Sequence, residues 1–304
     1  MKLEATRQAF GEALFEEMKI NPKVFALTAD VGESLRMMKI KEELPDRLID
    51  TGVAESNMIG ISAGLALKGY VPVAGAFACF MTRAYDHIRV QICQNNLHAI
   101  IVGSHAGVSN SPDGGTANAL EDIAYMRALA NMKIVFPADA QEVREALPLL
   151  ISSEGPFYLR LYREPTPLIE NKPIFELGKG QVLRDGKDIT IIATGPQVAF
   201  ALEASELLKA EGVFAEIISI PTIKPIDSGT IIQSAMKTKN VFTVEDHSIF
   251  GGLGSAVSEV LSENFPVKIK RIGWTKFGES GKFKDLIGLG GLSATEIVKT
   301  VMNK

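Results

Sequence analysis

Short apolar segments alternate with segments of helical period along the whole chain. The apolar segments predict strands at residues 24–28, 48–51, 71–76, 99–102, 133–136, 158–161, 189–193, 214–219 and 240–244. Between them, apolar residues three and four apart predict helices at residues 6–19, 56–67, 80–95, 121–129, 139–151, 197–210, 227–236, 252–263 and 294–302. Strands that are apolar almost throughout and are joined by helices indicate parallel sheets with helices on both faces.

A proline-rich segment interrupts this alternation near the middle of the 304-residue chain. Prolines at positions 165, 167 and 173 suit neither a helix interior nor a central strand, so the segment indicates a linker. The sequence therefore predicts an α/β protein of two domains, residues 1–163 and 181–304, joined by a linker at 164–180. We expect each domain to be a mainly parallel sheet covered by helices.

The composition narrows the possible functions. Lys and Arg together number 32 and Asp and Glu 36, so the net charge of −4 argues against a general nucleic-acid binder. The two cysteines, Cys79 and Cys93, are too few for a disulfide scaffold or a four-cysteine zinc site. No apolar run is long enough to span a membrane and the first residues show no signal peptide, so we expect a cytoplasmic protein.

Functional side chains follow several of the predicted strands directly. Glu55, Phe77, His105 and Arg163 each lie just past a strand end. Because ligands bind at the carboxyl ends of parallel strands, these positions predict a ligand site with an acid, aromatic rings and cations. Spacing alone also allows structural roles, since an acid such as Glu55 is favoured at the start of a helix.

Four sequence motifs together resemble the transketolase family. They lie at residues 52–59 (GVAESNMI), 77–86 (FACFMTRAYD), 113–124 (DGGT followed by LEDIA) and 244–248 (VEDHS). The resemblance is to the C-terminal subunit of a split, two-subunit transketolase that depends on thiamine diphosphate, and it covers essentially the whole chain. It implies a thiamine-diphosphate pyrimidine-binding domain followed by a transketolase C-terminal domain. It also implies an N-terminal partner subunit that binds the diphosphate and holds Mg²⁺, in an α2β2 heterotetramer, with no metal site in this chain.

The resemblance implies cofactor contacts for five residues. Glu55 matches the family glutamate that hydrogen-bonds N1′ of the aminopyrimidine ring and favours removal of the proton from thiazolium C2, so it is the expected catalytic residue. Phe80 matches the aromatic residue that stacks on the pyrimidine, and Phe77 matches a neighbouring aromatic contact. Arg83 stands where transketolases often have tyrosine and deoxyxylulose-phosphate synthases have arginine. Asp30 matches an acid near the cofactor at the subunit contact.

The resemblance also implies substrate contacts. Ser34, His105 and Arg163 match groups that hold the terminal phosphate of the sugar. An arginine suits that task because its planar fork donates two hydrogen bonds to an oxyanion. Asp113 matches the acid that binds a sugar hydroxyl.

One departure from the family motif bears on the substrate. The family usually reads Asp-Gly-x-Thr-His-Gln, whereas this chain has Ala117 in place of the histidine, followed by Asn118. Alanine cannot donate a hydrogen bond to the donor's first hydroxyl or transfer a proton. Either a neighbour such as Asn118 takes this role, or the substrate is unusual, or the activity is weak.

The predicted function is transfer of a two-carbon ketol unit from a ketose to an aldose. The terminal anion of these sugars is expected to be phosphate, with sulfonate as the alternative. Two other functions stay open: the β subunit of a 2-oxo-acid dehydrogenase E1, which has the same two-domain layout, and a non-catalytic subunit that holds the cofactor. The sequences at 113–116 and 121–124 favour transketolase over the dehydrogenase.

Overall fold

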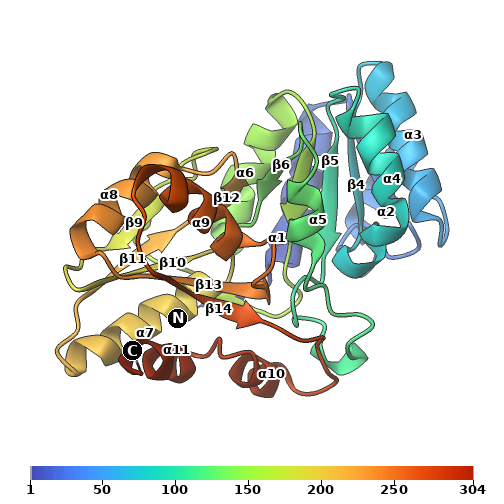
Figure 1. Ribbon diagram of the computed structural model, residues 1–304. Helices are drawn as coiled ribbons and strands as arrows, with labels where there is room; N and C mark the ends of the chain where they lie inside the picture. Colours follow the sequence, from blue (N-terminus) through green and yellow to red (C-terminus); the bar gives the residue numbers. More distant parts are fainter. Residues whose placement is uncertain (1, 304) are drawn as a thin grey trace.

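The computed structural model describes residues 2–303 and contains two large sheets side by side, one for each half of the chain, each covered by helices, and a small antiparallel sheet of the segments Leu3–Glu4 and Thr166–Pro167 (Figure 1). The first half contains β1 (Leu3–Glu4), α1 (Thr6–Ile20), β2 (Val24–Thr28), α2 (Met38–Glu43), β3 (Leu48–Asp50), α3 (Glu55–Leu67), β4 (Val71–Phe77), β5 (Ile100–Ser104), α5 (Asp122–Arg127), β6 (Lys133–Val135), α6 (Ala140–Ser152), β7 (Phe157–Arg160) and β8 (Thr166–Pro167). The second half contains β9 (Gln181–Arg184), β10 (Ile189–Ala193), α7 (Gln197–Ala210), β11 (Ala215–Ser219), β12 (Thr222–Lys224), α8 (Ser228–Thr238), β13 (Val241–Ser248), α9 (Leu253–Asn264), β14 (Ile269–Trp274), α10 (Phe283–Leu289) and α11 (Ala294–Met302). The predicted α/β class is confirmed.

The first sheet has seven strands in the order β12-β6-β7-β5-β4-β2-β3. All neighbours are parallel except β12, which pairs antiparallel with β6. Strand β12 comes from the second half of the chain, so the sheet of the first half is completed by residues beyond 181. Beside this pair, the Phe136 N–H donates a hydrogen bond to the Pro221 carbonyl (2.8 Å).

Neighbouring residues of the central strands face opposite layers of helices. Val73 and Ile100 are fully buried in a core formed with α1 and α6, whereas Ala74 and Ile101 are fully buried in a core formed with α3 and α5. Both faces of each strand are therefore removed from water, which explains why these strands are apolar almost throughout rather than alternating.

The second sheet has five strands in the order β14-β13-β10-β11-β9, parallel except for β9. Helices α7 and α11 cover one face and α8 and α9 cover the other. Strand β13 extends to Ser248, four residues beyond the prediction. The sequence pattern did not predict β1, β8, β9, β12, β14, α2 or α10. Of these, β9, β12 and β14 are edge strands of the two large sheets, and β1 and β8 form the small antiparallel sheet.

The helix predicted at residues 80–95 is not a continuous α-helix. The structure has a 3₁₀-helix at Ala78–Ala84, a short α-helical turn at Tyr85–His87 and a π-helix at Ile88–Cys93. In a 3₁₀-helix, side chains three residues apart lie directly above one another. The segment that follows β4 is therefore wound more tightly than the apolar spacing indicated.

None of the helices in residues 2–303 combines the length and the apolar character that crossing a membrane requires.

Candidate functional site

Five parallel strands of the first sheet, β2, β3, β4, β5 and β7, end at the same edge. The predicted site residues Asp30, Glu55, Phe77, His105 and Arg163 lie at or just beyond these strand ends. The topology therefore brings together residues that are up to 133 positions apart in the sequence (30 to 163). This edge is the candidate functional site.

Glu55 is the first residue of α3 and only 4% of its surface is exposed. Arg83 Nη1 donates a hydrogen bond to Glu55 Oε1 (3.3 Å), although the Arg83 side chain is 59% exposed. Within residues 2–303 the other carboxylate oxygen of Glu55 accepts no hydrogen bond. The second oxygen of this buried acid is thus available to a ligand. The first oxygen is bound only weakly, because Arg83 is exposed to water.

Two phenylalanine rings lie close to Arg83, the partner of this acid. The rings of Phe77 and Phe80 are stacked, with centroids 5.4 Å apart and planes 12° apart. The Arg83 guanidinium lies 5.1 Å from the centre of the Phe80 ring. The His105 ring stacks on the Phe77 ring, with ring centroids 3.8 Å apart. Phe80 and Arg83 lie one turn apart on the 3₁₀-helix, so their side chains lie on one line, and Phe77 is the last residue of β4, directly before this helix.

His105 is a neutral, buried residue. Its Nε2 accepts a hydrogen bond from Arg7 Nη1 (3.0 Å), because arginine can only donate. The remaining proton is then on Nδ1, which donates to Ser104 Oγ (3.0 Å). Burial, followed by the charges of three nearby arginines, lowers the pKa of His105 to about 3. Both ring nitrogens are therefore engaged within the protein, and the ring orients Arg7.

The neutral state of His105 makes stability depend on pH. The unfolded chain binds a proton at the ordinary histidine pKa of about 6.5, whereas the folded protein binds it only near pH 3. Stability from this residue is therefore present above pH 6.5 and is lost as the pH falls, by about 1 kcal/mol per pH unit. His105→Asn, which tolerates the backbone φ of 57°, should remove this dependence.

Urea unfolding of both proteins at pH 7, 6 and 5 measures the difference. The buried His247, whose pKa burial lowers to about 4, is present in both proteins and cancels in the comparison. An equal loss of unfolding free energy in wild type and variant on acidification would show that His105 does not titrate in this way.

Sequence reasoning missed two arginines at this edge. Arg7 lies in the first turn of α1 and Arg36 lies between β2 and α2, and both line one cavity together with the predicted residue Arg163. Arg7 also donates a hydrogen bond to the carbonyl of Ser34 (3.1 Å). A single arginine at the start of an amphipathic helix resembles a solvated surface charge, so no local signal distinguished Arg7.

The loop that connects β5 to α5 is fixed in place by contacts with residues of the second half of the chain. Asp246 of β13 accepts hydrogen bonds from the Val108 N–H (2.9 Å) and from Trp274 Nε1 (2.8 Å), and Tyr162 also donates to it. A Cβ at Gly107, where φ is +60°, would lie 1.9 Å from the Asp246 carboxylate, so this close approach requires glycine. The loop that carries residues 113–118 is thus fixed by a residue of the other half.

A buried ion pair contacts the end of this loop. Arg160 donates to both carboxylate oxygens of Asp122 (2.7 and 2.9 Å) and to the Ala119 carbonyl (2.9 Å), and neither charged side chain is more than 1% exposed. Burial alone would raise the pKa of Asp122, but the Arg160 guanidinium outweighs it and the pKa is lowered. Both groups stay charged, and the pair fixes the end of β7 to the start of α5.

The remaining predicted residues differ in their surroundings. Asp30 and Asp113 are exposed. Ala117 is 9% exposed, and Asn118 is buried with its Nδ2 donating to the Glu279 carbonyl (3.3 Å). Asn118 lines a polar cavity with Thr82 and other residues, separate from the arginine-lined one. The structure thus does not bring Asn118 together with Arg7, Arg36 and Arg163.

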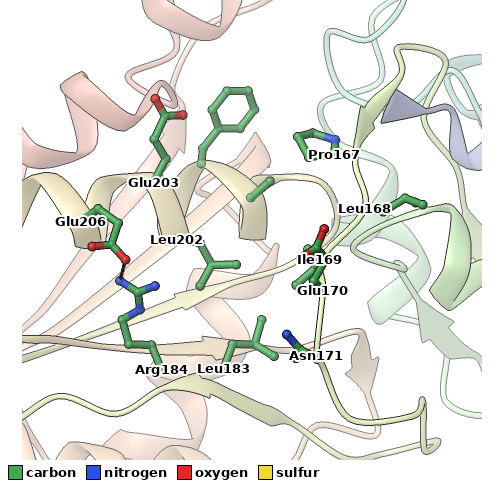
Figure 2. Close-up of a pocket in the computed structure, with 12 residues that line it drawn as sticks. Pro167, Leu168, Ile169, Glu170, Asn171, Leu183, Arg184, Leu202, Glu203 and Glu206 are labelled. Atoms are coloured by element: carbon green, nitrogen blue, oxygen red, sulfur yellow. Dashed lines mark hydrogen bonds and ion pairs between the residues drawn. The ribbon is translucent and has the colours of Figure 1, made fainter. Parts of the chain in front are cut away.

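A groove of about 570 Å³ lies outside this site, between the segment Pro167–Asn171, helix α7 and strand β9 (Figure 2). Its walls include Ile169, Leu183 and Leu202, and Arg184 pairs with Glu206 at its rim. None of the predicted site residues lines it, so it forms no part of the candidate site.

Comparison with known families matches both halves of the chain. The family described as "Transketolase, pyrimidine binding domain" matches residues 3–167, and the family described as "Transketolase, C-terminal domain" matches residues 178–297.

Two curated relatives are components of named enzymes. The chain is 39% identical over 296 residues to the 6-deoxy-6-sulfo-D-fructose transketolase subunit of Clostridium sp. (strain MSTE9), covering 96% of this chain and 92% of the relative. It is 37% identical over 272 residues to one of the apulose-4-phosphate transketolase subunits of Phocaeicola vulgatus, covering 88% of this chain and 87% of the relative. A solved structure described as a split-gene transketolase, inactive β4 tetramer, is 40% identical, with a TM-score of 0.89 over 98% of this chain and 97% of that one.

Proposed function

This chain belongs to the transketolase family, and from that premise we propose that it is the pyrimidine-binding subunit of a two-subunit, thiamine-diphosphate-dependent transketolase. The enzyme would transfer a two-carbon ketol unit from a ketose to an aldose. The observation that carries the proposal is one edge of a parallel sheet that presents a buried acid, a stacked aromatic pair and an arginine-lined cavity. The related transketolase subunits do not favour the 2-oxo-acid dehydrogenase alternative.

The side chains at this edge fit the pyrimidine half of thiamine diphosphate. Glu55 has a carboxylate oxygen free to hydrogen-bond a ring nitrogen, and Phe77 and Phe80 offer flat apolar faces for stacking. When bound, thiamine diphosphate supplies the electron sink for cleavage of the ketose carbon chain. Glu55 would hold the proton at N1′ of the aminopyrimidine. When the ring binds, Arg83 would either keep its hydrogen bond to Glu55 beside the ring or give it up. Asp30 would lie near the contact with the partner subunit.

The arginine-lined cavity fits the terminal anion of a sugar. Arg7 and Arg163 would bind the anion, with Ser34 beside them, and this set adds Arg7 to the residues predicted from the sequence. Because both nitrogens of His105 are engaged, His105 would act by orienting Arg7 rather than by donating to the anion. Asp113, on an exposed turn, would bind a sugar hydroxyl.

The proposal includes a partner subunit. An N-terminal subunit would bind the diphosphate and Mg²⁺, while this chain would bind the pyrimidine half of the cofactor. The solved relative described as an inactive β4 tetramer supports a requirement for a second kind of chain. We propose an α2β2 assembly.

Reconstitution tests this proposal. The chain would be purified alone and together with a partner that carries the diphosphate-binding domain, and ketol transfer from xylulose 5-phosphate to ribose 5-phosphate would be measured. We expect transfer only in the mixture, because each subunit holds one half of the cofactor. The same mixture should not oxidise 2-oxo acids onto a lipoyl domain. Substantial transfer by this chain alone, or turnover of 2-oxo acids, would overturn the proposal.

A further inference from the structure

Three arginines from distant parts of the chain converge on one cavity of about 360 Å³. Arg7 comes from α1, Arg36 from the turn before α2, and Arg163 from the segment after β7. The carboxylates in its wall are Glu4 and Glu164, and Glu4 is already paired with Lys2 and Arg144. With Glu4 paired, only Glu164 offsets the three arginines, so the net charge of the cavity wall is +2.

The arginines lack carboxylate partners of their own. Across residues 2–303, none of the three lies within 4.0 Å of an acidic oxygen. Arg7 donates to the Ser34 carbonyl and to His105, Arg163 donates to Asn110 Oδ1 (2.5 Å), and the buried Nε of Arg7 has no hydrogen-bond partner. Burial, and then the charges of Arg36 and Arg163, lower the pKa of Arg7 to about 10. Such mutually repelling cations are stabilised by an anion.

Arg36, which lines the cavity, has an unfavourable backbone conformation. Its φ is +61°, a left-handed conformation that costs about 1 kcal/mol or more for a residue with a Cβ. The packing also requires glycine at position 11, because a Cβ there would lie 2.4 Å from the Arg36 carbonyl oxygen. The Arg36 side chain itself is exposed and makes no hydrogen bond within residues 2–303. The backbone of Arg36 is thus held by its own contacts, whereas its charged side chain pairs with nothing within residues 2–303 and adds a third positive charge to the cavity wall.

We propose that Arg36 is a specificity residue that makes this cavity prefer a doubly charged terminal group, so that the enzyme accepts sugar phosphates over sugar sulfonates. The inference rests on the proposed function, which assigns the cavity to the terminal anion. A phosphate monoester carries about −1.5 to −2 charges at pH 7, whereas a sulfonate of the same tetrahedral shape carries one. Two arginines suffice for a single charge, and the third discriminates between the two groups. The two curated relatives are named for a sulfo-sugar and for a sugar phosphate, so both kinds of anion occur among similar subunits.

Calorimetric titration of the full chain with methyl phosphate and with methanesulfonate tests the preference directly. We expect wild type to bind methyl phosphate at least tenfold more tightly. Arg36→Asn suits the positive φ and should weaken methyl phosphate about tenfold while changing methanesulfonate less than threefold. Arg36→Lys keeps the charge and should retain most of the preference. Lys39→Asn is the matched control. Lys39 lies three residues after Arg36, and its charged side chain lines a different cavity, so its removal should change neither affinity.

Ketol transfer by the reconstituted enzyme separates this inference from the proposed function. If transfer occurs but Arg36→Asn leaves the phosphate-to-sulfonate ratio of kcat/KM unchanged, the role of Arg36 is wrong and the proposed function stands. If no transfer occurs but methyl phosphate binds in an Arg36-dependent way, the anion site stands and the proposed function is wrong. Equal weakening of both anions by Arg36→Asn would also overturn the inference, because it would show a general charge effect.

Discussion

Replacing Glu55 by glutamine should slow exchange of the C2 proton of bound thiamine diphosphate by about 10²–10⁴-fold, the usual contribution of a positioned acid–base group. Glutamine has the same shape, but its amide cannot hold and exchange the proton at N1′ that the proposed mechanism requires. The fold should be little affected, because within residues 2–303 Glu55 forms an ion pair with Arg83 alone, whose side chain is 59% exposed. The measurement is C2–H/D exchange, followed by NMR on the complex with the diphosphate-binding partner.

Glu121 provides the matched control for this substitution. It is a partly buried glutamate in the wall of the neighbouring polar cavity, and burial raises its pKa. Glu121→Gln should leave the C2 exchange rate close to wild type, because the proposal gives Glu121 no contact with the pyrimidine. An exchange rate within threefold of wild type for Glu55→Gln would show that Glu55 is only an acid at the start of a helix, paired with Arg83.

The central strands of both sheets were predictable from the sequence because each is buried on both faces. Residues 24–28 and 189–193 were predicted with the bounds that the structure has, and both are fully or largely buried strands between two helical layers. Strand β14 was not predicted. It lies at a sheet edge and mixes exposed and buried positions, so it lacks the continuous apolar run. Strand β12 could not be assigned to the first sheet, because its partner β6 lies almost 90 residues earlier.

The segment after β4 shows how a pattern can be right in spacing and wrong in structure. Phe80 and Arg83 belong to the segment in which the apolar spacing predicts a continuous helix at residues 80–95. In the structure both lie on a 3₁₀-helix, one turn apart, which places Arg83 over Phe80, while the Phe77 ring at the end of β4 stacks on the Phe80 ring. The local geometry of the candidate cofactor site therefore depends on a helix type that the apolar period does not reveal.

The candidate site residues come from sequence motifs, whereas Arg7 and Arg36 join them only through tertiary contacts. Arg7 and Arg36 became recognisable only when the fold brought them to Arg163 and His105. Asp246 likewise holds the loop between β5 and α5 from the other half of the chain, 138 residues away from its partner Val108. Such contacts leave no periodic signal, because nothing in the local sequence of either partner depends on the other.

At Ala117 the resemblance to the transketolase family implies a histidine in the usual motif, and the structure shows what surrounds this position. Ala117 is buried, and the amide nitrogen of its neighbour Asn118 already donates to the Glu279 carbonyl. One N–H of the Asn118 amide is therefore engaged in this contact between the two halves, and its second N–H makes no hydrogen bond within residues 2–303. We infer that the native donor is bound without a hydrogen bond from residue 117 itself, in a pocket shaped around the small side chain of Ala117.

Ala117→His should accordingly change which donor is preferred. The imidazole adds bulk where the native donor or Asn118 now lies, so kcat/KM for the native donor should fall, while kcat/KM for xylulose 5-phosphate should rise. The change in the ratio should approach the effect of one oxyanion donor, about 10²–10³-fold. Ala117→Phe, which adds similar bulk without a donor, should lower both activities. The measurement is steady-state kcat/KM of wild type and the two variants with both donors. If Ala117→His raised kcat/KM for both donors in parallel, the alanine would merely weaken the site and no specialised pocket would exist.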